Sequence, residues 1–412
     1  MKFFYAETRD TVDPSYDFEL ETREEWRMPH SDDLYPHEIF TTPPYHGILF
    51  SWANIGASSG KTRRYSLSQR HRLLRIGLKG FFRIDTPDIE TMGDCGAFAY
   101  HQMPEPPVSV DEVFQFYVDC DVDYGISVDH VILGYNSKLD NAFDSFGLIP
   151  PDWVNRQQLT IDLANEFMFR WEKDKPRFTP LGVAQGWSPK SYQQSIQQLQ
   201  NMGYSRIALG GMVPLKTHEI LACLESINEI RDKSTQLHLL GVSRVPYTNV
   251  FKKFGVSSFD SSSPMRQAFL DDADNYHTLT RQYTAIRVPQ SDANIRLSKM
   301  IRSGTLNQSN VIASEKGCMQ ALKHYEARQM PLNDVLEALV EYGNLHQLGN
   351  RSISRYKETL EDRPWEICPC PLCKAIGIHI VIFRGAERNK RRGFHNIWMT
   401  TQKLEQEYSK LT

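Results

Sequence analysis

Short apolar segments alternate with longer amphipathic stretches from about residue 46 onward. The apolar segments predict strands, whereas the stretches between them repeat apolar positions with the 3.6-residue period of a helix. Two of the predicted helices have clear start signals, because Ser109 precedes two acids and Ser188 precedes a proline. The predicted strands are 46–52, 80–84, 124–133, 178–186, 206–211, 236–243 and 256–263.

Repeated strand–helix units with apolar strands are typical of a parallel sheet that helices cover on the outside. More than six such units without a glycine-rich dinucleotide-binding turn favour a closed barrel over an open sheet. We therefore predict an α/β fold, a (β/α)8 TIM barrel. The expected parts are an N-terminal extension (1–45), the barrel core (46–269), a mainly helical insertion (270–362) and a cysteine-containing C-terminal segment with a helix (363–412).

The composition is that of a soluble protein with a sizeable core, since 40% of residues are hydrophobic and 24% are charged. The formal net charge of −3 means that any contact with nucleic acid has to be local. No apolar run indicates a signal peptide or a membrane span, so we expect a cytoplasmic protein without membrane contact. GASSGKT (56–62) is similar to a phosphate-binding loop, but three residues rather than four separate its glycines, which excludes that site.

Three of the seven cysteines are gathered in CPCPLC, as Cys368, Cys370 and Cys373. A C-x-C-x-x-C group supplies three soft ligands, and zinc takes four in a tetrahedron. We favour His395 as the fourth ligand over His379, which falls in a predicted strand; the alternative is three reduced thiols in a loop. Because three cysteines and a histidine would fill every position, the zinc should be structural, and 363–412 should form a zinc-binding subdomain.

The carboxyl ends of barrel strands are where catalytic side chains gather, and polar residues follow several predicted strands here. The segments are GDCGAF with Asp94, SVDHV with Asp129, VAQGW with Gln185, ALGGM with Gly210 and Gly211, and SFDSSSPMR with Asp260. Each of these residues taken singly has an ordinary structural interpretation, such as a turn, a helix cap or an ion pair. Cys95, beside Asp94, is interpreted as a small buried residue.

The order of these segments, followed by C-x-C-x-x-C and a histidine, resembles the tRNA-guanine transglycosylase family over about residues 46–396. Some positions depart from the family pattern: Gln-Gly-Gly is Gln-Gly-Trp187 here, Pro-Thr-Arg is Pro-Met265-Arg, and Lys216 stands where the tRNA enzymes have a glutamate. The C-terminal segment RPWEICPCPLC…GIHIVIFRGAERNKRRGFHN is similar to that of the 7-deazaguanine DNA transglycosylase branch, called DpdA.

The resemblance implies an enzyme that exchanges guanine in DNA for the 7-deazaguanine base preQ0 through a covalent aspartyl–sugar intermediate. It makes Asp260 the nucleophile and Asp94 the general acid and base. Asp129, Gln185 and the Gly211 amide would bind the guanine-like base, Gly210 would admit the flat ring, and Lys216 would lie near the 7-substituent. The alternatives are the same chemistry on tRNA, or a non-catalytic subunit; both aspartates persist, which argues against the latter. Docking of accessory DNA-modification proteins on the insertion is a further expectation.

A basic run near the C-terminus is the candidate contact for DNA phosphates, with a solvated basic face as the alternative. It consists of Arg384, Arg388, Lys390, Arg391 and Arg392. A second basic set is more ambiguous and consists of Arg70, Arg72, Arg75, Lys79 and Arg83.

Overall fold

The structure is a computed structural model, and it describes residues 1–7, 9–55, 65–141, 148–292, 295–346 and 352–409. The GASSGKT segment lies outside the described residues. The chain forms two compact units. Unit 1 contains residues 1–8, 45–262 and 404–412, and unit 2 contains residues 9–44 and 263–403.

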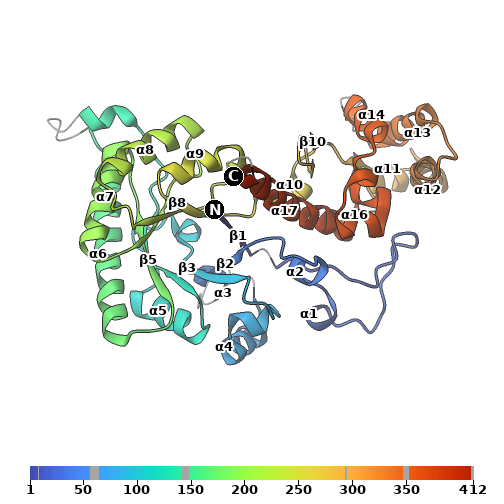
Figure 1. Ribbon diagram of the computed structural model, residues 1–412. Coiled ribbons are helices and arrows are strands. Elements are labelled where there is room, and N and C mark those ends of the chain that lie inside the picture. Colours follow the sequence, from blue (N-terminus) through green and yellow to red (C-terminus); the bar gives the residue numbers. More distant parts are fainter. Residues whose placement is uncertain (8, 56–64, 142–147, 293–294, 347–351, 410–412) are drawn as a thin grey trace. The chain divides into compact units, whose positions relative to one another are not determined.

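Unit 1 is a closed barrel of eight parallel strands that follow one another in chain order (Figure 1). The strands are β1 (Lys2–Ala6), β2 (Gly47–Ser51), β3 (Glu90–Asp94), β4 (Tyr124–Ile126), β5 (Thr179–Ala184), β6 (Arg206–Leu209), β7 (Gln236–Leu239) and β8 (Val256–Ser261). Pairing of β1 with β8, with Phe4 opposite Asp260, closes the barrel. The predicted (β/α)8 barrel is therefore confirmed.

The helices of unit 1 lie between these strands. They are α3 (Trp52–Ile55), α4 (Leu67–Phe81), α5 (Val110–Asp119), α6 (Pro151–Asp174), α7 (Pro189–Asn201), α8 (Thr217–Ile230) and α9 (Thr248–Lys253), with short 3-10 turns at 97–100, 137–141 and 245–247. The predicted start signals are confirmed, since the hydroxyls of Ser109 and Ser188 accept hydrogen bonds from the backbone N–H groups of Glu112 and Ser191.

Two predictions about the first strands are wrong. The segment expected to precede the barrel contains β1, whose Phe3, Phe4 and Tyr5 are buried because the strand pairs on both sides. The predicted strand 80–84 is instead the end of α4 and the turn after it, and the strand in this place is β3. The five residues of β1, KFFYA, are too few to show a periodicity that distinguishes a barrel strand from an extension.

Apolar side chains pack together in the barrel interior. The core cluster consists of Phe4, Leu49, Met92, Ile126, Leu181, Val183 and Ala208, contributed by β1 to β6. Polar side chains also occur within the barrel, where the centre of the His238 ring lies 5.9 Å from the centre of the Phe4 ring of this cluster.

Unit 2 contains the helices α1 (Pro29–Asp32), α2 (Pro36–Ile39), α10 (Ser263–Leu270), α11 (Ile295–Arg302), α12 (Gln308–Glu326), α13 (Leu332–Leu345), α14 (Ile353–Asp362), α15 (Pro364–Ile367) and α16 (Pro371–Ile376). A long final helix, α17 (Gly385–Ser409), has its last six residues in unit 1. In the insertion that was predicted to be mainly helical, short strands β9 (Tyr276–His277), β10 (Gln282–Tyr283) and β11 (Ile286–Arg287) precede the helices α11 to α14. Strand β11 pairs with β12 (Ile382–Phe383). Among the described residues, no helix has the length and apolar character needed to cross a membrane.

Candidate active site and metal centre

Three carboxylates gather at the carboxyl ends of the barrel strands. Asp94 is the last residue of β3, Asp129 follows β4, and Asp260 lies on β8. The Asp94 carboxylate accepts hydrogen bonds from the Ser51 hydroxyl at 2.8 Å and the Gly96 N–H at 3.0 Å. Burial and the negative charges of Asp129 and Asp260 nevertheless raise the pKa of Asp94 to about 7. A carboxyl group with such a pKa exchanges its proton readily near neutral pH.

Asp260 is held through one of its two carboxylate oxygens. Its Oδ1 accepts a hydrogen bond from the Gly241 N–H at 2.8 Å and lies 3.2 Å from Nε2 of His238. Nδ1 of His238 lies 2.8 Å from the Ser258 hydroxyl, so a neutral imidazole that accepts from this serine donates to Asp260. Among the described residues, no hydrogen bond engages Oδ2 of Asp260, which leaves that oxygen able to attack.

His238 is a site residue that the sequence analysis did not single out. It lies on β7 opposite Ser258 of β8, and its side chain is buried. The one sequence signal is a histidine inside the otherwise apolar run QLHLLGV. This signal is weak, because buried histidines are common in sheets and the partner Asp260 is 22 residues away.

Asp129 forms the polar floor of the site together with Gln185 and Cys95. Its Oδ2 accepts a hydrogen bond from the Gln185 side-chain amide at 2.6 Å, and its Oδ1 accepts one from the Cys95 thiol at 3.2 Å. Burial raises the pKa of Asp129 to about 6, although both hydrogen bonds act to lower it. Burial also raises the pKa of Cys95 far above its usual range, so the thiol stays protonated, in keeping with its interpretation as a buried residue.

Gly210 and Gly211 follow β6 and pack directly against this floor. A Cβ on Gly210 would lie 2.1 Å from the Gln185 amide nitrogen, and a Cβ on Gly211 would lie 2.4 Å from the Ile132 carbonyl oxygen. Gly211 also has a φ of +71°, which favours glycine. Lys216, by contrast, is exposed just before α8, where its backbone N–H donates to Glu219 at 2.7 Å.

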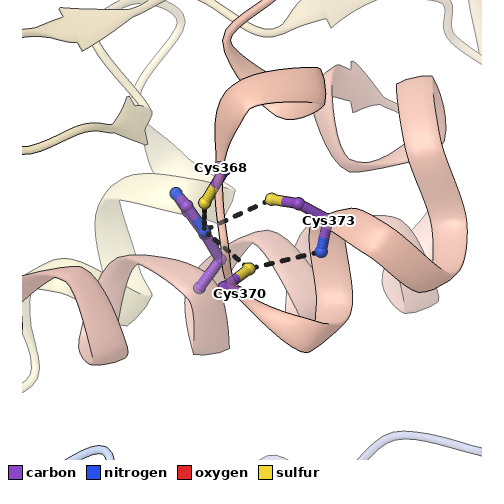
Figure 2. Close-up of side chains that lie close together, drawn as sticks. Cys368, Cys370 and Cys373 are labelled. Atoms are coloured by element: carbon purple, nitrogen blue, oxygen red, sulfur yellow. Dashed lines mark hydrogen bonds between the residues drawn. The ribbon is translucent and has the colours of Figure 1, made fainter.

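The three thiols of the cysteine cluster converge on one point in unit 2 (Figure 2). Nδ1 of His395 lies 3.8, 3.3 and 3.5 Å from the Sγ atoms of Cys368, Cys370 and Cys373. A tetrahedral zinc with Zn–S of about 2.3 Å and Zn–N of about 2.0 Å separates sulfur and nitrogen by about 3.5 Å, so the four ligands fit zinc. Nε2 of His395 lies 2.7 Å from the His277 carbonyl oxygen, a contact that fixes the orientation of the ring.

His379, the alternative fourth ligand, lies elsewhere. It is in a 3-10 turn (Gly377–Val381) rather than the predicted strand, and its Nδ1 accepts a hydrogen bond from Arg388 at 3.3 Å. Burial lowers the pKa of His379 to about 4, and the charge of Arg388 adds to this effect. His395 therefore lies beside the three thiols, and His379 does not.

No family model matches the chain. The chain is, however, 45% identical over 411 residues to a DNA-guanine transglycosylase from Salmonella montevideo, covering 98% of this chain and 97% of that protein. The chain belongs to the tRNA-guanine transglycosylase superfamily. A second relative in this superfamily, a queuine tRNA-ribosyltransferase from Chlamydia felis (strain Fe/C-56), is 27% identical over 100 residues, which is 24% of this chain and 27% of that protein.

The basic run of this superfamily member does not form the exposed face that was expected. Four arginines of the run are buried: Arg384, which precedes α17, and Arg388, Arg391 and Arg392 within it. Arg384 donates twice to the Glu21 carboxylate at 2.7 Å, and the Arg388 guanidinium also donates to Glu21. Arg392 donates to backbone carbonyls, among them Ala268 at 2.7 Å.

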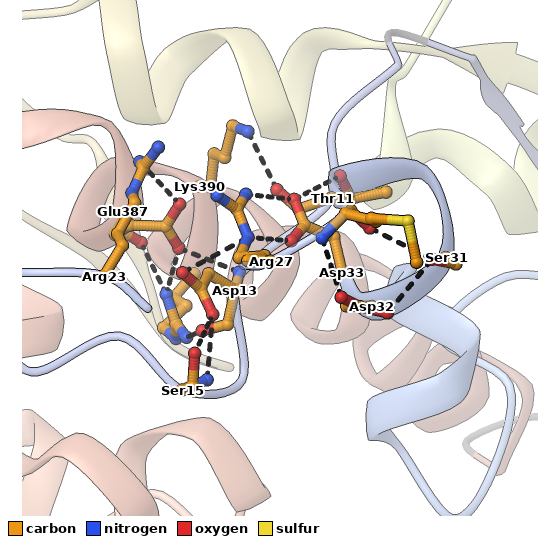
Figure 3. Close-up of polar contacts among 12 residues, drawn as sticks. Thr11, Asp13, Ser15, Arg23, Arg27, Ser31, Asp32, Asp33, Glu387 and Lys390 are labelled. Atoms are coloured by element: carbon orange, nitrogen blue, oxygen red, sulfur yellow. Dashed lines mark hydrogen bonds and ion pairs between the residues drawn. The ribbon is translucent and has the colours of Figure 1, made fainter. Parts of the chain in front are cut away.

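Residues 9–44 supply most of the other partners of this basic run (Figure 3). Lys390 donates to the Thr11 carbonyl at 2.8 Å, and Arg391 donates to the Asp13 carbonyl and to the Glu387 carboxylate. The interpretation of 384–392 as a phosphate-binding surface is therefore wrong. The cationic side chains of the run instead pair with carboxylate and carbonyl oxygens inside unit 2. Partners such as Glu21 and Thr11 could not be recognised from the sequence, because they lie more than 350 residues earlier in the chain.

Proposed function

We propose that this protein exchanges guanine in DNA for a 7-deazaguanine base, preQ0, through a covalent aspartyl–sugar intermediate. The observation that carries the proposal is the group of three carboxylates at the barrel mouth. Asp94 has a pKa of about 7, and Asp260 is held through Oδ1, with no hydrogen bond to Oδ2 from the part of the chain that the structure describes. The near full-length similarity to a DNA-guanine transglycosylase supports both the reaction and the DNA substrate.

The reaction replaces one N-glycosidic bond by another at the same carbon. Oδ2 of Asp260 attacks C1′ of the deoxyribose, and the bond from C1′ to the guanine nitrogen breaks. Asp94, protonated at that moment, gives its proton to the departing guanine. The incoming base then loses its proton to the Asp94 carboxylate and attacks C1′, which releases Asp260 and restores the starting protonation state.

The polar floor of the site, formed by Asp129 with Gln185, is proposed to bind the base. Asp129 would accept hydrogen bonds from the N1–H and exocyclic amine of a guanine-like ring, and the Gly211 amide would donate to O6. The Gln185 amide has a double role in this proposal, because it holds Asp129 through one N–H and keeps a second N–H for the base.

Lys216 is proposed to favour the nitrile base preQ0 over its aminomethyl analogue. An ammonium repels a cationic aminomethyl group and can donate to a nitrile nitrogen. Competition between the two bases for incorporation tests this, with a preference of about 1–3 kcal/mol expected for wild type and lost in Lys216→Glu. A mutant that keeps the wild-type preference would remove Lys216 from base selection.

The cysteine cluster is proposed to hold a structural zinc through Cys368, Cys370, Cys373 and His395. All four ligand positions are then taken by the protein, so the metal stabilises unit 2 and takes no part in base exchange.

The second candidate function is the same base exchange on tRNA. The local similarity to a queuine tRNA-ribosyltransferase favours it.

Incubation of the purified protein with radiolabelled preQ0 and either plasmid DNA or bulk tRNA decides between the two substrates. We expect label in DNA and release of an equal amount of guanine. Label in tRNA alone would establish the second candidate, and label in neither would contradict the proposed activity. The Asp260→Ala variant is the control for incorporation that does not depend on the site.

A further inference from the structure

Tyr276 lies beside the cysteine cluster and is not one of its four ligands. Its hydroxyl oxygen lies 3.2 Å from Sγ of Cys373. Its ring stacks on the ring of His395, with 4.3 Å between the ring centres and 3° between the ring planes. The Tyr276 side chain is fully buried. One side chain therefore contacts both a sulfur ligand and the nitrogen ligand of the proposed zinc site.

The backbone on either side of Tyr276 is hydrogen-bonded to the helix that carries His395. Strand β9, which contains Tyr276, pairs with β10. The His277 N–H donates to the Asn396 side chain at 3.0 Å, and the Asn396 amide donates to the Asn275 carbonyl at 3.0 Å. The His277 carbonyl oxygen lies 2.7 Å from Nε2 of His395. These contacts fix the position of the Tyr276 ring relative to the histidine.

The proposed zinc site would carry a net negative charge inside the protein. Three thiolates outweigh the charge of one Zn²⁺ when the histidine is neutral, and all four ligands are buried. A hydrogen-bond donor offsets such a charge, because a bond to an ionised acceptor is stronger than one between neutral groups. Among the described residues, Tyr276 is the one side chain outside the ligand set that lies within hydrogen-bonding distance of a ligand sulfur.

We propose that Tyr276 is a positioning residue of the metal site, whose hydroxyl donates to the Cys373 thiolate and whose ring holds the His395 imidazole in its ligating orientation. The inference rests on the proposed zinc site. A thiolate that binds zinc has no proton, so the sulfur accepts and the hydroxyl donates. The sequence gives no sign of this role, because Tyr276 and Cys373 are 97 residues apart.

The test uses Tyr276→Phe, which keeps the ring and removes only the hydroxyl. Tyr325→Phe is the matched control, because Tyr325 is a buried tyrosine of the same unit whose hydroxyl donates to the Leu360 carbonyl at 2.8 Å. The zinc affinity of the full-length protein is measured by competition with a colorimetric chelator at fixed pH. Tyr276→Phe should bind zinc about 10- to 100-fold more weakly than wild type, the usual effect of losing a partner of a metal ligand. Tyr325→Phe should keep the wild-type affinity.

Tyr276→Leu separates the ring from the hydroxyl, because it removes both. This variant should bind zinc more weakly than Tyr276→Phe does. Equal affinities of the two variants would overturn the role of the ring.

Cobalt(II) in place of zinc gives a readout that a loss of packing does not move. The absorption spectrum of thiolate-bound cobalt contains sulfur-to-metal charge-transfer bands. Loss of the hydrogen bond to Cys373 should shift these bands to lower energy in Tyr276→Phe and leave them unchanged in Tyr325→Phe. An unchanged zinc affinity in Tyr276→Phe, or weaker binding without a band shift, would overturn the role of the hydroxyl. Wild-type protein that binds neither metal would overturn the proposed zinc site together with this inference, and it would leave the proposed base exchange to its own test.

Discussion

Asp94 shows how the surroundings of one residue determine its chemistry. Its carboxyl group has a pKa of about 7 because burial and two neighbouring aspartates oppose its ionisation, and the hydrogen bonds from Ser51 and Gly96 only partly offset this effect. Asp94→Asn keeps the shape but cannot transfer a proton, so base exchange should fall by about 10²- to 10⁴-fold. Asp88→Asn, an exposed carboxylate before β3, is the matched control and should exchange normally.

The same shift predicts the pH dependence of stability. The folded protein holds a proton on Asp94 at pH values where the unfolded chain has lost it, so this group makes the free energy of unfolding fall as pH rises from about 4 to about 7. Asp94→Asn should remove this contribution and unfold at a higher temperature than wild type at pH 8. A lower unfolding temperature for the variant at pH 8 would contradict the assigned ionisation.

His238 is predicted to be a positioning residue for Asp260. His238→Phe removes the donor to Oδ1, and a hydrogen bond to a charged group contributes about 1.5–3 kcal/mol, so kcat should fall by about 10- to 100-fold. KM for DNA should change little, and His238→Gln, which keeps a donor, should recover part of the rate. An effect on KM alone, or an equal loss in both variants, would show that His238 acts only through packing.

At the scale of elements, the contact between residues 9–44 and α17 depends on Glu21. Although burial raises its pKa, the hydrogen bonds and charges of Arg384 and Arg388 lower the pKa of Glu21 to about 2. The ionised Glu21 carboxylate therefore stabilises the folded state through its two arginine partners above about pH 4.5. This contribution is lost as pH falls toward about 2.

Glu21→Gln should consequently lower the free energy of unfolding at pH 7 by up to about 3 kcal/mol, because it leaves two buried guanidinium groups without this partner. The loss should shrink in acid, and denaturant unfolding at pH 7 and pH 3 measures both. Glu358→Gln, which breaks an exposed pair with Arg281, should cost less than about 1 kcal/mol. Equal effects of the two substitutions would contradict a structural role for the arginine run.

The barrel and much of the site could be predicted from the sequence, for physical reasons that differ between elements. The strands β5 to β8 are apolar runs with clear turns, and the residues at their ends stand in a family order. The remaining features depend on long-range pairing: β1 is recognisable only beside β8, and His238 only beside Asp260. Arg384 and Arg388 look like part of a surface run because Glu21, the carboxylate that they share, lies more than 350 residues earlier in the chain.

At the scale of the whole molecule, the metal centre should decide whether unit 2 folds. The four ligands come from two segments 22 residues apart, and they need a cation to offset gathered thiolates. Metal analysis should find about one zinc per chain, and Cys370→Ser should give unfolded or insoluble protein. Cys318→Ser, a buried thiol of α12 outside the cluster, should stay folded with its zinc. Pure, folded protein without zinc would contradict this account.

The central claim is that Asp260 forms a covalent bond to the sugar, and trapping that intermediate tests it most directly. Wild-type protein is mixed with labelled guanine-containing DNA without an incoming base, denatured, and run on a denaturing gel, with mass spectrometry to locate the attachment. The account predicts a protein–DNA adduct at Asp260 in wild type and none in Asp260→Ala, which should still fold and bind DNA. An adduct that persists in Asp260→Ala would show that another residue attacks the sugar.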